Sequence, residues 1–176
     1  MGLRAKIFIV LLVGVNVLHA QDKPALEYQV KAAFLYNFTR FITWPATAFS
    51  SPDAPFVIGI IGNDPFGSYL EEVVAGEKVD NHPIIVQHYH NQKEIGKCQI
   101  IFLNLTEPPE LKEALTVLQS ENTLAVSDAS NFAELGGQVQ FFKESGKVRL
   151  QINVAAAKKS QLEISSKLLR IAKIHK

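Results

Sequence analysis

The chain has 176 residues, with 18 lysines and arginines against 17 aspartates and glutamates, and a formal net charge of +1. This length is typical of a single domain with a hydrophobic core, and the near-neutral charge gives no electrostatic reason to expect nucleic acid as a partner. Cys98 is the only cysteine, which excludes an internal disulfide, so core packing must stabilise the fold. We expect Cys98 to be a buried core thiol, with an intermolecular bridge as the alternative.

Residues 1–20 have the pattern of a secretory signal peptide. Arg4 and Lys6 precede a mostly apolar run over residues 7–18, and Ala20 offers a small residue for cleavage. The run is shorter than the roughly 20 residues that span a membrane. We therefore expect cleavage near Ala20 and a periplasmic protein of residues 21–176, with an uncleaved anchor as the alternative. Residues 21–176 carry 16 basic and 17 acidic residues, because the first twenty hold two cations and no acid.

Beyond residue 20, apolar periodicity and turn residues alternate between the patterns of helices and strands. We expect helices over residues 24–44, 69–74 and 108–118, and a helical turn over 132–135. Strands are expected over residues 56–61, 83–89, 99–105, 123–126, 139–142 and 148–152. The last two would form a hairpin around Gly146. Ser160 and Glu163 have the spacing of a capping box, which predicts a long C-terminal helix with Ile164, Leu168 and Ile171 on one face.

This alternation predicts an α/β fold in one domain. Strands 56–61 and 99–105 are almost continuously apolar, as in a parallel sheet that is covered on both faces. We therefore expect a Rossmann-like three-layer sandwich with a mostly parallel sheet. An antiparallel C-terminal hairpin would form one edge, and the first helix would be an addition to the sandwich.

The first expected helix is apolar over a wide arc. Its apolar side chains span roughly 220°, whereas a helix on one core needs about 100°. This width suggests a second buried face against a partner or a second copy of the chain. The residues that we expect in such an interface are Phe34, Leu35, Phe38 and Ile42. The alternative is a helix that its own domain covers completely.

A ligand cleft is a second candidate site. Asp64 and Phe66 follow the first strand of the expected sheet, and Ser127 and Asp128 follow a later one. Ligands of open α/β sheets bind at the carboxyl ends of strands, so these four side chains could line a cleft for a small solute. The alternative is local: Asn63 or Asp64 would cap a helix, and Ser127 and Asp128 would form a turn.

The sequence gives little reason to expect a metal, a cofactor or an enzyme. His82, His88 and His90 would share one face of a strand, but no cysteine lies nearby and the carboxylates have no recognisable ligand spacing. We expect a solvated strand face and no bound metal. The common catalytic motifs, such as a nucleophile elbow or a glycine-rich phosphate loop, are absent from the sequence. We therefore expect a binding protein that needs no cofactor.

Four stretches of the sequence together form a distinctive pattern. The most specific is KAAFLYNFTRFITWP at residues 31–45, and IGIIGNDPFG follows at residues 58–67. The pattern continues through Val126-Ser127-Asp128, Phe132 and Gly136-Gly137, and through residues 148–153 and 165–172. It extends over nearly all of the chain that follows the expected signal peptide, and it resembles the YfiR family of periplasmic regulators.

The resemblance implies a periplasmic repressor that binds the periplasmic sensor part of an inner-membrane diguanylate cyclase. An outer-membrane lipoprotein would sequester the repressor, after which cyclic-di-GMP would rise and favour biofilm formation. Well-studied relatives carry cysteine pairs linked to redox control, which Cys98 alone cannot reproduce through an internal bridge. Another membrane sensor protein is an open alternative for the partner. A different class of function is a small-solute-binding protein that feeds a transporter or receptor.

Overall fold

The computed structural model describes residues 23–118 and 121–175. The expected signal peptide and its cleavage point lie outside these residues. The described residues form five α-helices, and none of these helices is long and apolar enough to cross a membrane. Their bounds are α1 Lys23–Phe41, α2 Tyr69–Val74, α3 Pro108–Leu118, α4 Val154–Lys159 and α5 Ser166–Leu169.

A mostly parallel sheet forms the centre of the described chain. Its strand order is β10-β8-β7-β6-β5-β2-β4-β3. Parallel pairing joins five consecutive strands of this order, namely β4, β2, β5, β6 and β7. The β7–β8 and β3–β4 pairs are antiparallel. The bounds are β2 Phe56–Gly62, β3 Lys78–Val79, β4 His82–Tyr89, β5 Ile100–Asn104, β6 Leu124–Ser127, β7 Val139–Glu144, β8 Lys147–Ile152 and β10 Lys173–Ile174. The expected α/β class and parallel sheet are thus confirmed.

The β7–β8 hairpin is not the edge strand pair that we expected. Strand β10 pairs in parallel with β8 and lies outside it, through the register Lys173↔Gln151 and Ile174↔Ile152. The hairpin turn itself has Ser145 at φ 51° and Gly146 at φ 74°. Two successive positive φ values are the mark of the two-residue hairpin turn that the glycine predicts.

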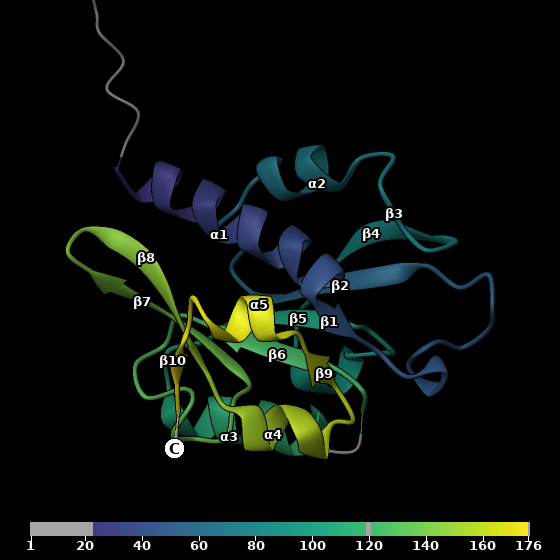
Figure 1. The fold of residues 1–176 in the computed structure, drawn as a ribbon. Helices are drawn as coiled ribbons and strands as arrows, with labels where there is room; N and C mark the ends of the chain where they lie inside the picture. Colours follow the sequence, from purple (N-terminus) through teal and green to yellow (C-terminus); the bar gives the residue numbers. More distant parts are fainter. Residues whose placement is uncertain (1–22, 119–120, 176) are drawn as a thin grey trace, which may run out of the picture.

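Both faces of the sheet are covered, which explains the near-continuous apolar strands. In β2, Phe56, Ile58 and Ile60 belong to one buried cluster together with α1 and α2. Val57 and Ile61 belong to a second buried cluster together with α3. Figure 1 shows α1 and α2 on one side of the sheet and α3 on the other. This arrangement is compatible with the expected three-layer sandwich.

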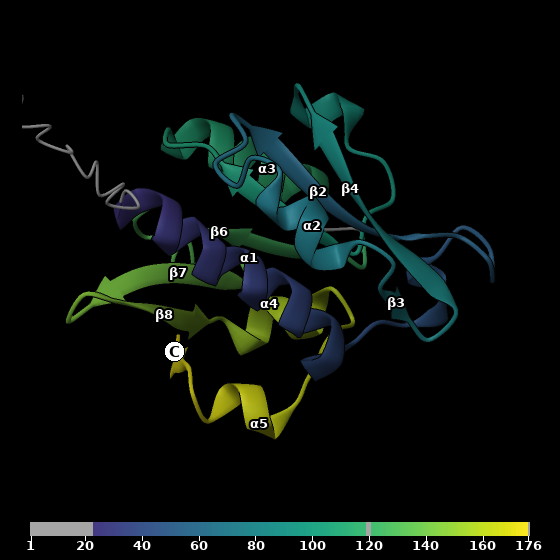
Figure 2. The ribbon, with the colours of Figure 1, turned by 90° about the horizontal axis from the view of Figure 1, so that it is seen from above.

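Helix α1 lies across the first face of the sheet. Seen from above, it passes between α2 and the β7–β8 hairpin (Figure 2). Phe38 stacks on Phe141 of β7 with ring centroids 6.2 Å apart. The helix ends at Phe41, three residues earlier than expected, because Ile42 pairs with Ile164 in a two-stranded sheet of β1 Ile42–Thr43 and β9 Glu163–Ile164.

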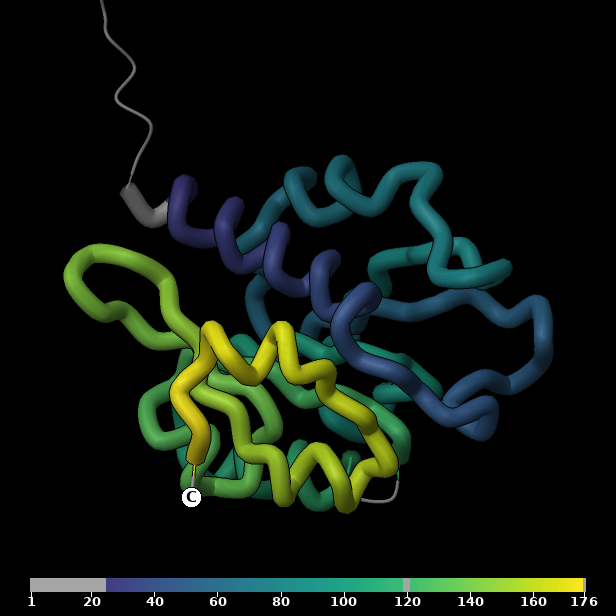
Figure 3. The backbone as a smooth tube through the Cα atoms, in the orientation of Figure 1, coloured from purple at the N-terminus to yellow at the C-terminus, as the bar shows by residue number. Residues whose placement is uncertain are grey.

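The long C-terminal helix predicted from Ser160 and Glu163 is wrong. Ser160 instead ends α4, and its buried hydroxyl accepts a hydrogen bond from Gln138 Nε2 at 2.9 Å. Gln161 then takes a φ of 58°, a left-handed conformation that no helix can continue through. Figure 3 follows the C-terminal segment from α4 past the end of α1 and back to the sheet, through β9, α5 and β10.

Candidate functional site

The structure places the expected interface residues of α1 mainly in the chain's own core. Leu35 and Phe38 have no exposed surface, and Ile42 is 4% exposed. Phe34 is only partly buried and packs on Phe141, with ring centroids 5.9 Å apart. The interface assignment is therefore corrected for Leu35, Phe38 and Ile42. The wide apolar arc has a simpler cause, since α1 packs against the sheet, α2 and the C-terminal segment at once.

A different part of α1 leaves apolar surface in contact with solvent. Leu26 is 53% exposed and Val30 is 39% exposed. They line a groove with a volume of about 560 Å³ between α1 and the β7–β8 hairpin. We call it the α1–hairpin groove, and its lining residues are Leu26, Glu27, Val30, Phe34, Lys143, Gly146, Lys147 and Val148. Sequence periodicity marked the whole helix as apolar and gave no means of separating this surface from the core.

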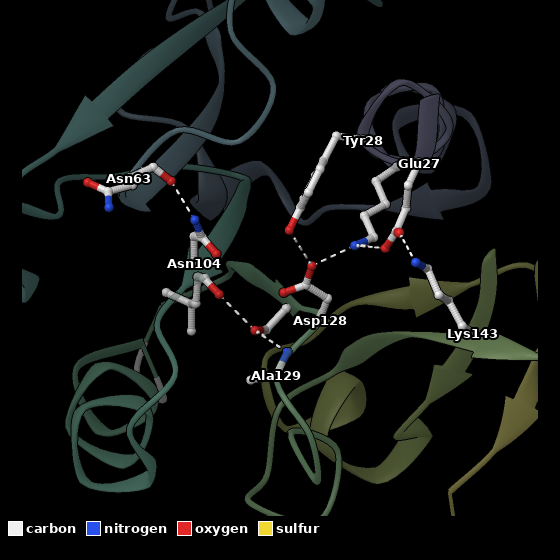
Figure 4. A network of polar contacts seen from close by, with 10 residues as sticks. Glu27, Tyr28, Asn63, Asn104, Asp128, Ala129 and Lys143 are labelled. Atoms are coloured by element: carbon white, nitrogen blue, oxygen red, sulfur yellow. Dashed lines mark hydrogen bonds and ion pairs between the residues drawn. The ribbon is translucent and has the colours of Figure 1, made fainter. Parts of the chain in front are cut away.

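A network of charged side chains holds this end of α1 to the sheet (Figure 4). Lys31 is 3% exposed, and its ammonium lies 2.5 Å from Asp128 Oδ2 and 2.6 Å from Glu27 Oε1. Tyr28 donates its hydroxyl hydrogen bond to the same oxygen of Asp128, at 2.9 Å. Glu27 also pairs with Lys143 of β7. Two cations and two carboxylates thus alternate from Asp128 to Lys143, and of these four residues Glu27 and Lys143 also line the α1–hairpin groove.

The pKa values within this network follow from burial and charge. Burial by itself would raise the pKa of Glu27, but the hydrogen bonds and charges of Lys143 and Lys31 outweigh it and lower that pKa below its usual value. Burial and the neighbouring carboxylate of Asp128 raise the pKa of Tyr28. The phenol therefore stays protonated and keeps donating to Asp128.

The cleft expected around Asp64, Phe66, Ser127 and Asp128 is occupied by the protein itself. Phe66 is in the core, edge-on to Phe102 at 4.9 Å and to Tyr28 at 5.6 Å. Ser127 has no exposed surface, and its hydroxyl bonds to the carbonyl of Leu103. These two residues are therefore not available to a ligand in this conformation, and helix α1 covers the place where one would sit.

The polar residues of the expected cleft have local roles. The Ser127 hydroxyl also accepts from the backbone N–H of Ala129 at 3.1 Å, so it shapes the turn after β6. Asp64 Oδ1 accepts from the backbone N–H of Phe66 at 2.7 Å. Helix α2 begins only at Tyr69, so Asp64 stabilises a turn and does not cap the helix.

The three histidines of the expected strand face lie in different surroundings. His82 stacks on Phe49 with ring centroids 3.9 Å apart, whereas His88 and His90 are exposed. His88 faces Asp64, and Glu71 of α2 completes a group whose potential ligand atoms all lie within 4.8 Å of one another. Sequence spacing gave no indication of this group, because its members come from three separate elements.

Comparisons with known proteins identify relatives of the chain. A family model described as YfiR/HmsC-like matches residues 28–173. A search of curated proteins gives no significant match. A solved structure, "Crystal structure of conserved domain protein from vibrio cholerae o1 biovar eltor str. n16961", is similar with a TM-score of 0.54 and 13% identity. The match covers 85% of this chain and 60% of the Vibrio cholerae chain. At this identity the similarity supports the fold alone.

Proposed function

We propose that this chain, which belongs to the YfiR/HmsC-like family of periplasmic regulators of diguanylate cyclases, binds and inhibits the periplasmic sensor part of an inner-membrane diguanylate cyclase. The family match over residues 28–173 is the observation that carries the proposal. In this function the chain acts by binding alone, and the chemistry takes place in the cyclase. The proposal includes export by the N-terminal segment and cleavage near Ala20.

The α1–hairpin groove is the surface that we assign to this partner. Leu26 and Val30 expose apolar area beside the cationic side chains of Lys143 and Lys147. Apolar surface of this kind, with charges at its rim, is typical of protein–protein contacts. An apolar helix of the sensor with acidic residues at its margin would match both features. The neighbouring ion pairs hold α1 in place, so the groove is preformed and little ordering entropy opposes binding.

Inhibition requires that the regulator prefers one state of its partner. A bound protein shifts a two-state equilibrium only by the ratio of its affinities for the two states. We therefore propose that the groove binds the inactive arrangement of the sensor more tightly than the active one. Release of the regulator would return the cyclase to its intrinsic equilibrium, and cyclic-di-GMP would rise.

A charge placed in the groove tests this function. Val30→Asp buries an unpaired carboxylate in any contact there, and we expect binding to weaken about ten-fold or more. Val117→Asp on α3 is the matched control, because Val117 is also a helical valine and is 41% exposed against 39% for Val30. Each variant is expressed in cells that lack the native protein, and cyclic-di-GMP is measured by mass spectrometry.

Wild type and Val117→Asp should lower cyclic-di-GMP, whereas Val30→Asp should not. A photo-crosslinking residue at Leu26 should capture a membrane cyclase from the same cells. Equal repression by all three proteins would remove the groove from the proposal. If the wild type leaves cyclic-di-GMP unchanged, or if only a permease is captured, inhibition of a cyclase is the wrong function.

Two further partners belong to this proposal. An outer-membrane lipoprotein would sequester the regulator by covering the same groove, which makes its binding and that of the cyclase mutually exclusive. A homodimer would have to use the remaining exposed surface of α1, since Leu35 and Phe38 are buried. Light scattering of the purified protein should then give twice the chain mass for wild type and for Val30→Asp alike, because Val30 lies in the groove and outside the dimer surface.

The alternative of a small-solute-binding protein is weakened by the position of α1. Tyr28 and Lys31 bind Asp128 at the place where a solute would lie, and Phe66 is buried beneath them. Solute binding would require α1 to leave the sheet. No observation on the described residues favours that movement over the closed arrangement.

A further inference from the structure

Three potential metal ligands meet at one corner of the sheet. Asp64 follows β2, Glu71 lies in the first turn of α2, and His88 is in β4. His88 Nε2 is 3.0 Å from Asp64 Oδ2 and 4.0 Å from Glu71 Oε1. The three groups come from different elements, so the tertiary fold alone brings them together.

The surrounding backbone orients two of these side chains. The N–H of Phe66 donates to Asp64 Oδ1 at 2.7 Å, which leaves Oδ2 directed toward His88. His88 is fixed along β4 by its register opposite Ile60 of β2. Hydrogen bonds of this outer kind hold a ligand in its binding orientation and raise its affinity for a metal. Glu71 and His88 are each 46% exposed, so an ion can reach the group from solvent.

The charges of this group are unbalanced. Among the described residues, the ion-pair partner of both Asp64 and Glu71 is His88, and neither carboxylate pairs with a lysine or arginine. Two carboxylates therefore share one imidazole as their ion-pair partner. Like charges at such short range repel each other, and a divalent cation between them would remove that repulsion.

We propose that Asp64, Glu71 and His88 bind a divalent transition-metal ion of the Zn²⁺ type. One imidazole nitrogen and two carboxylate oxygens are ligands that Zn²⁺ accepts, with water in the fourth position. Ligand atoms around tetrahedral Zn²⁺ lie about 3.4 Å apart, given bonds of about 2.1 Å. The separations of 3.0 and 4.0 Å in this structure bracket that value, and all three ligand atoms lie within 4.8 Å of one another, so rotation of the side chains would bring them to the distances of a bound ion. Mg²⁺ and Ca²⁺ prefer oxygen ligands and should bind poorly.

The ion would connect β2, β4 and α2. Its binding energy would then be added to the stability of the folded chain, because the unfolded chain does not hold the three ligands together. This inference does not depend on the partner proposed above. It can fail while the regulatory function stands, and the reverse is also true.

The test uses untagged protein of residues 21–176, treated with a chelator and dialysed. Titration with ZnCl₂ in a calorimeter should show one ion per chain, and the melting temperature should rise with added ZnCl₂ but not with equal MgCl₂. His88→Ala and Asp64→Asn should each weaken Zn²⁺ binding at least ten-fold. Asparagine keeps the oxygen that accepts from Phe66, so this variant retains its turn.

His90→Ala is the matched control, since His90 is also exposed and lies just after β4. It should bind Zn²⁺ as the wild type does. All variants should melt at the wild-type temperature in the presence of chelator. This control separates the loss of a metal-binding side chain from a loss of folding stability. The proposal is overturned if wild type binds no Zn²⁺, or if His90→Ala weakens binding as much as His88→Ala.

Discussion

The ammonium of Lys31 lies 2.5 Å from Oδ2 of Asp128, and this contact joins helix α1 to the turn after β6 across 97 residues of sequence. Lys31 is 3% exposed and Asp128 keeps 23% of its side chain in solvent. The pair is flanked by Glu27 and by the hydroxyl of Tyr28. The first helix is therefore fastened to the sheet at its polar end as well as through its apolar core face.

Loss of the Lys31 charge should destabilise the protein. Lys31→Met keeps much of the side-chain volume but leaves Asp128 without a cation, and breaking a buried pair from one side costs about 3–5 kcal/mol. We expect about 3 kcal/mol, the lower end of that range, because part of Asp128 remains in water. Urea unfolding followed by circular dichroism measures the difference.

Lys143→Met provides the comparison for this variant. Lys143 is 64% exposed and also pairs with Glu27, and an exposed pair contributes less than about 1 kcal/mol. Glu27 retains Lys31 in this variant. Equal losses of stability in the two variants would mean that burial of Lys31 is not what makes its ion pairs important.

Glu27 should make the protein less stable in acid. Its pKa is lowered in the folded state, because the hydrogen bonds and charges of Lys143 and Lys31 outweigh the opposing effect of burial. A depressed folded pKa contributes stability that is fully present above the usual pKa near 4.5 and is lost as the pH falls through the folded value. Glu27→Gln should therefore reduce the fall in unfolding free energy between pH 5 and 3, measured by urea titration at each pH. An unchanged slope would contradict this role.

Leu35→Asp distinguishes a core position from an interface position. Leu35 has no exposed surface, so the substitution places an unpaired carboxylate in the core and should unfold the protein or cost several kcal/mol. If Leu35 lay in an interface between chains, the monomer would remain folded and only association would suffer. Circular dichroism and light scattering separate the two outcomes, with Val30→Asp as the exposed counterpart on the same helix.

The thiol of Cys98 should not react with thiol reagents until the chain unfolds. It is 3% exposed, and burial raises the pKa of its thiol to about 12. The reactive thiolate is then scarce at pH 8, and reagents cannot reach the sulfur. A chromogenic disulfide reagent should label no thiol in native protein and one thiol per chain in 6 M guanidinium chloride. Rapid labelling of the native protein would indicate an accessible thiol and restore the intermolecular bridge as an explanation for Cys98.

The residues of the candidate sites show where sequence reasoning failed. The sequence predicted a wide apolar arc on α1, but not which part of the arc is buried. In the structure Leu35 and Phe38 are buried in the core, whereas Leu26 and Val30 are exposed to solvent. The sequence pattern also predicted correctly that Asp64 and Asp128 follow the carboxyl ends of strands. Whether a ligand can reach Asp128 depends on α1, whose Tyr28 and Lys31 bind its carboxylate. A helix that precedes the sheet in sequence gives no local sign of where it will pack.

Some elements follow from local sequence patterns alone. Apolar runs bounded by turn residues predicted β2, β5 and α3 to within a residue or two, and Gly146 predicted the hairpin turn. The C-terminal segment depends instead on tertiary contacts, since the hydrogen bond from Gln138 to Ser160 and the pairing of Ile42 with Ile164 replace the expected helix. The same holds for the meeting of Asp64, Glu71 and His88. These outcomes depend on contacts between residues far apart in the chain, and burial energies at such contacts exceed the small preferences of local propensity.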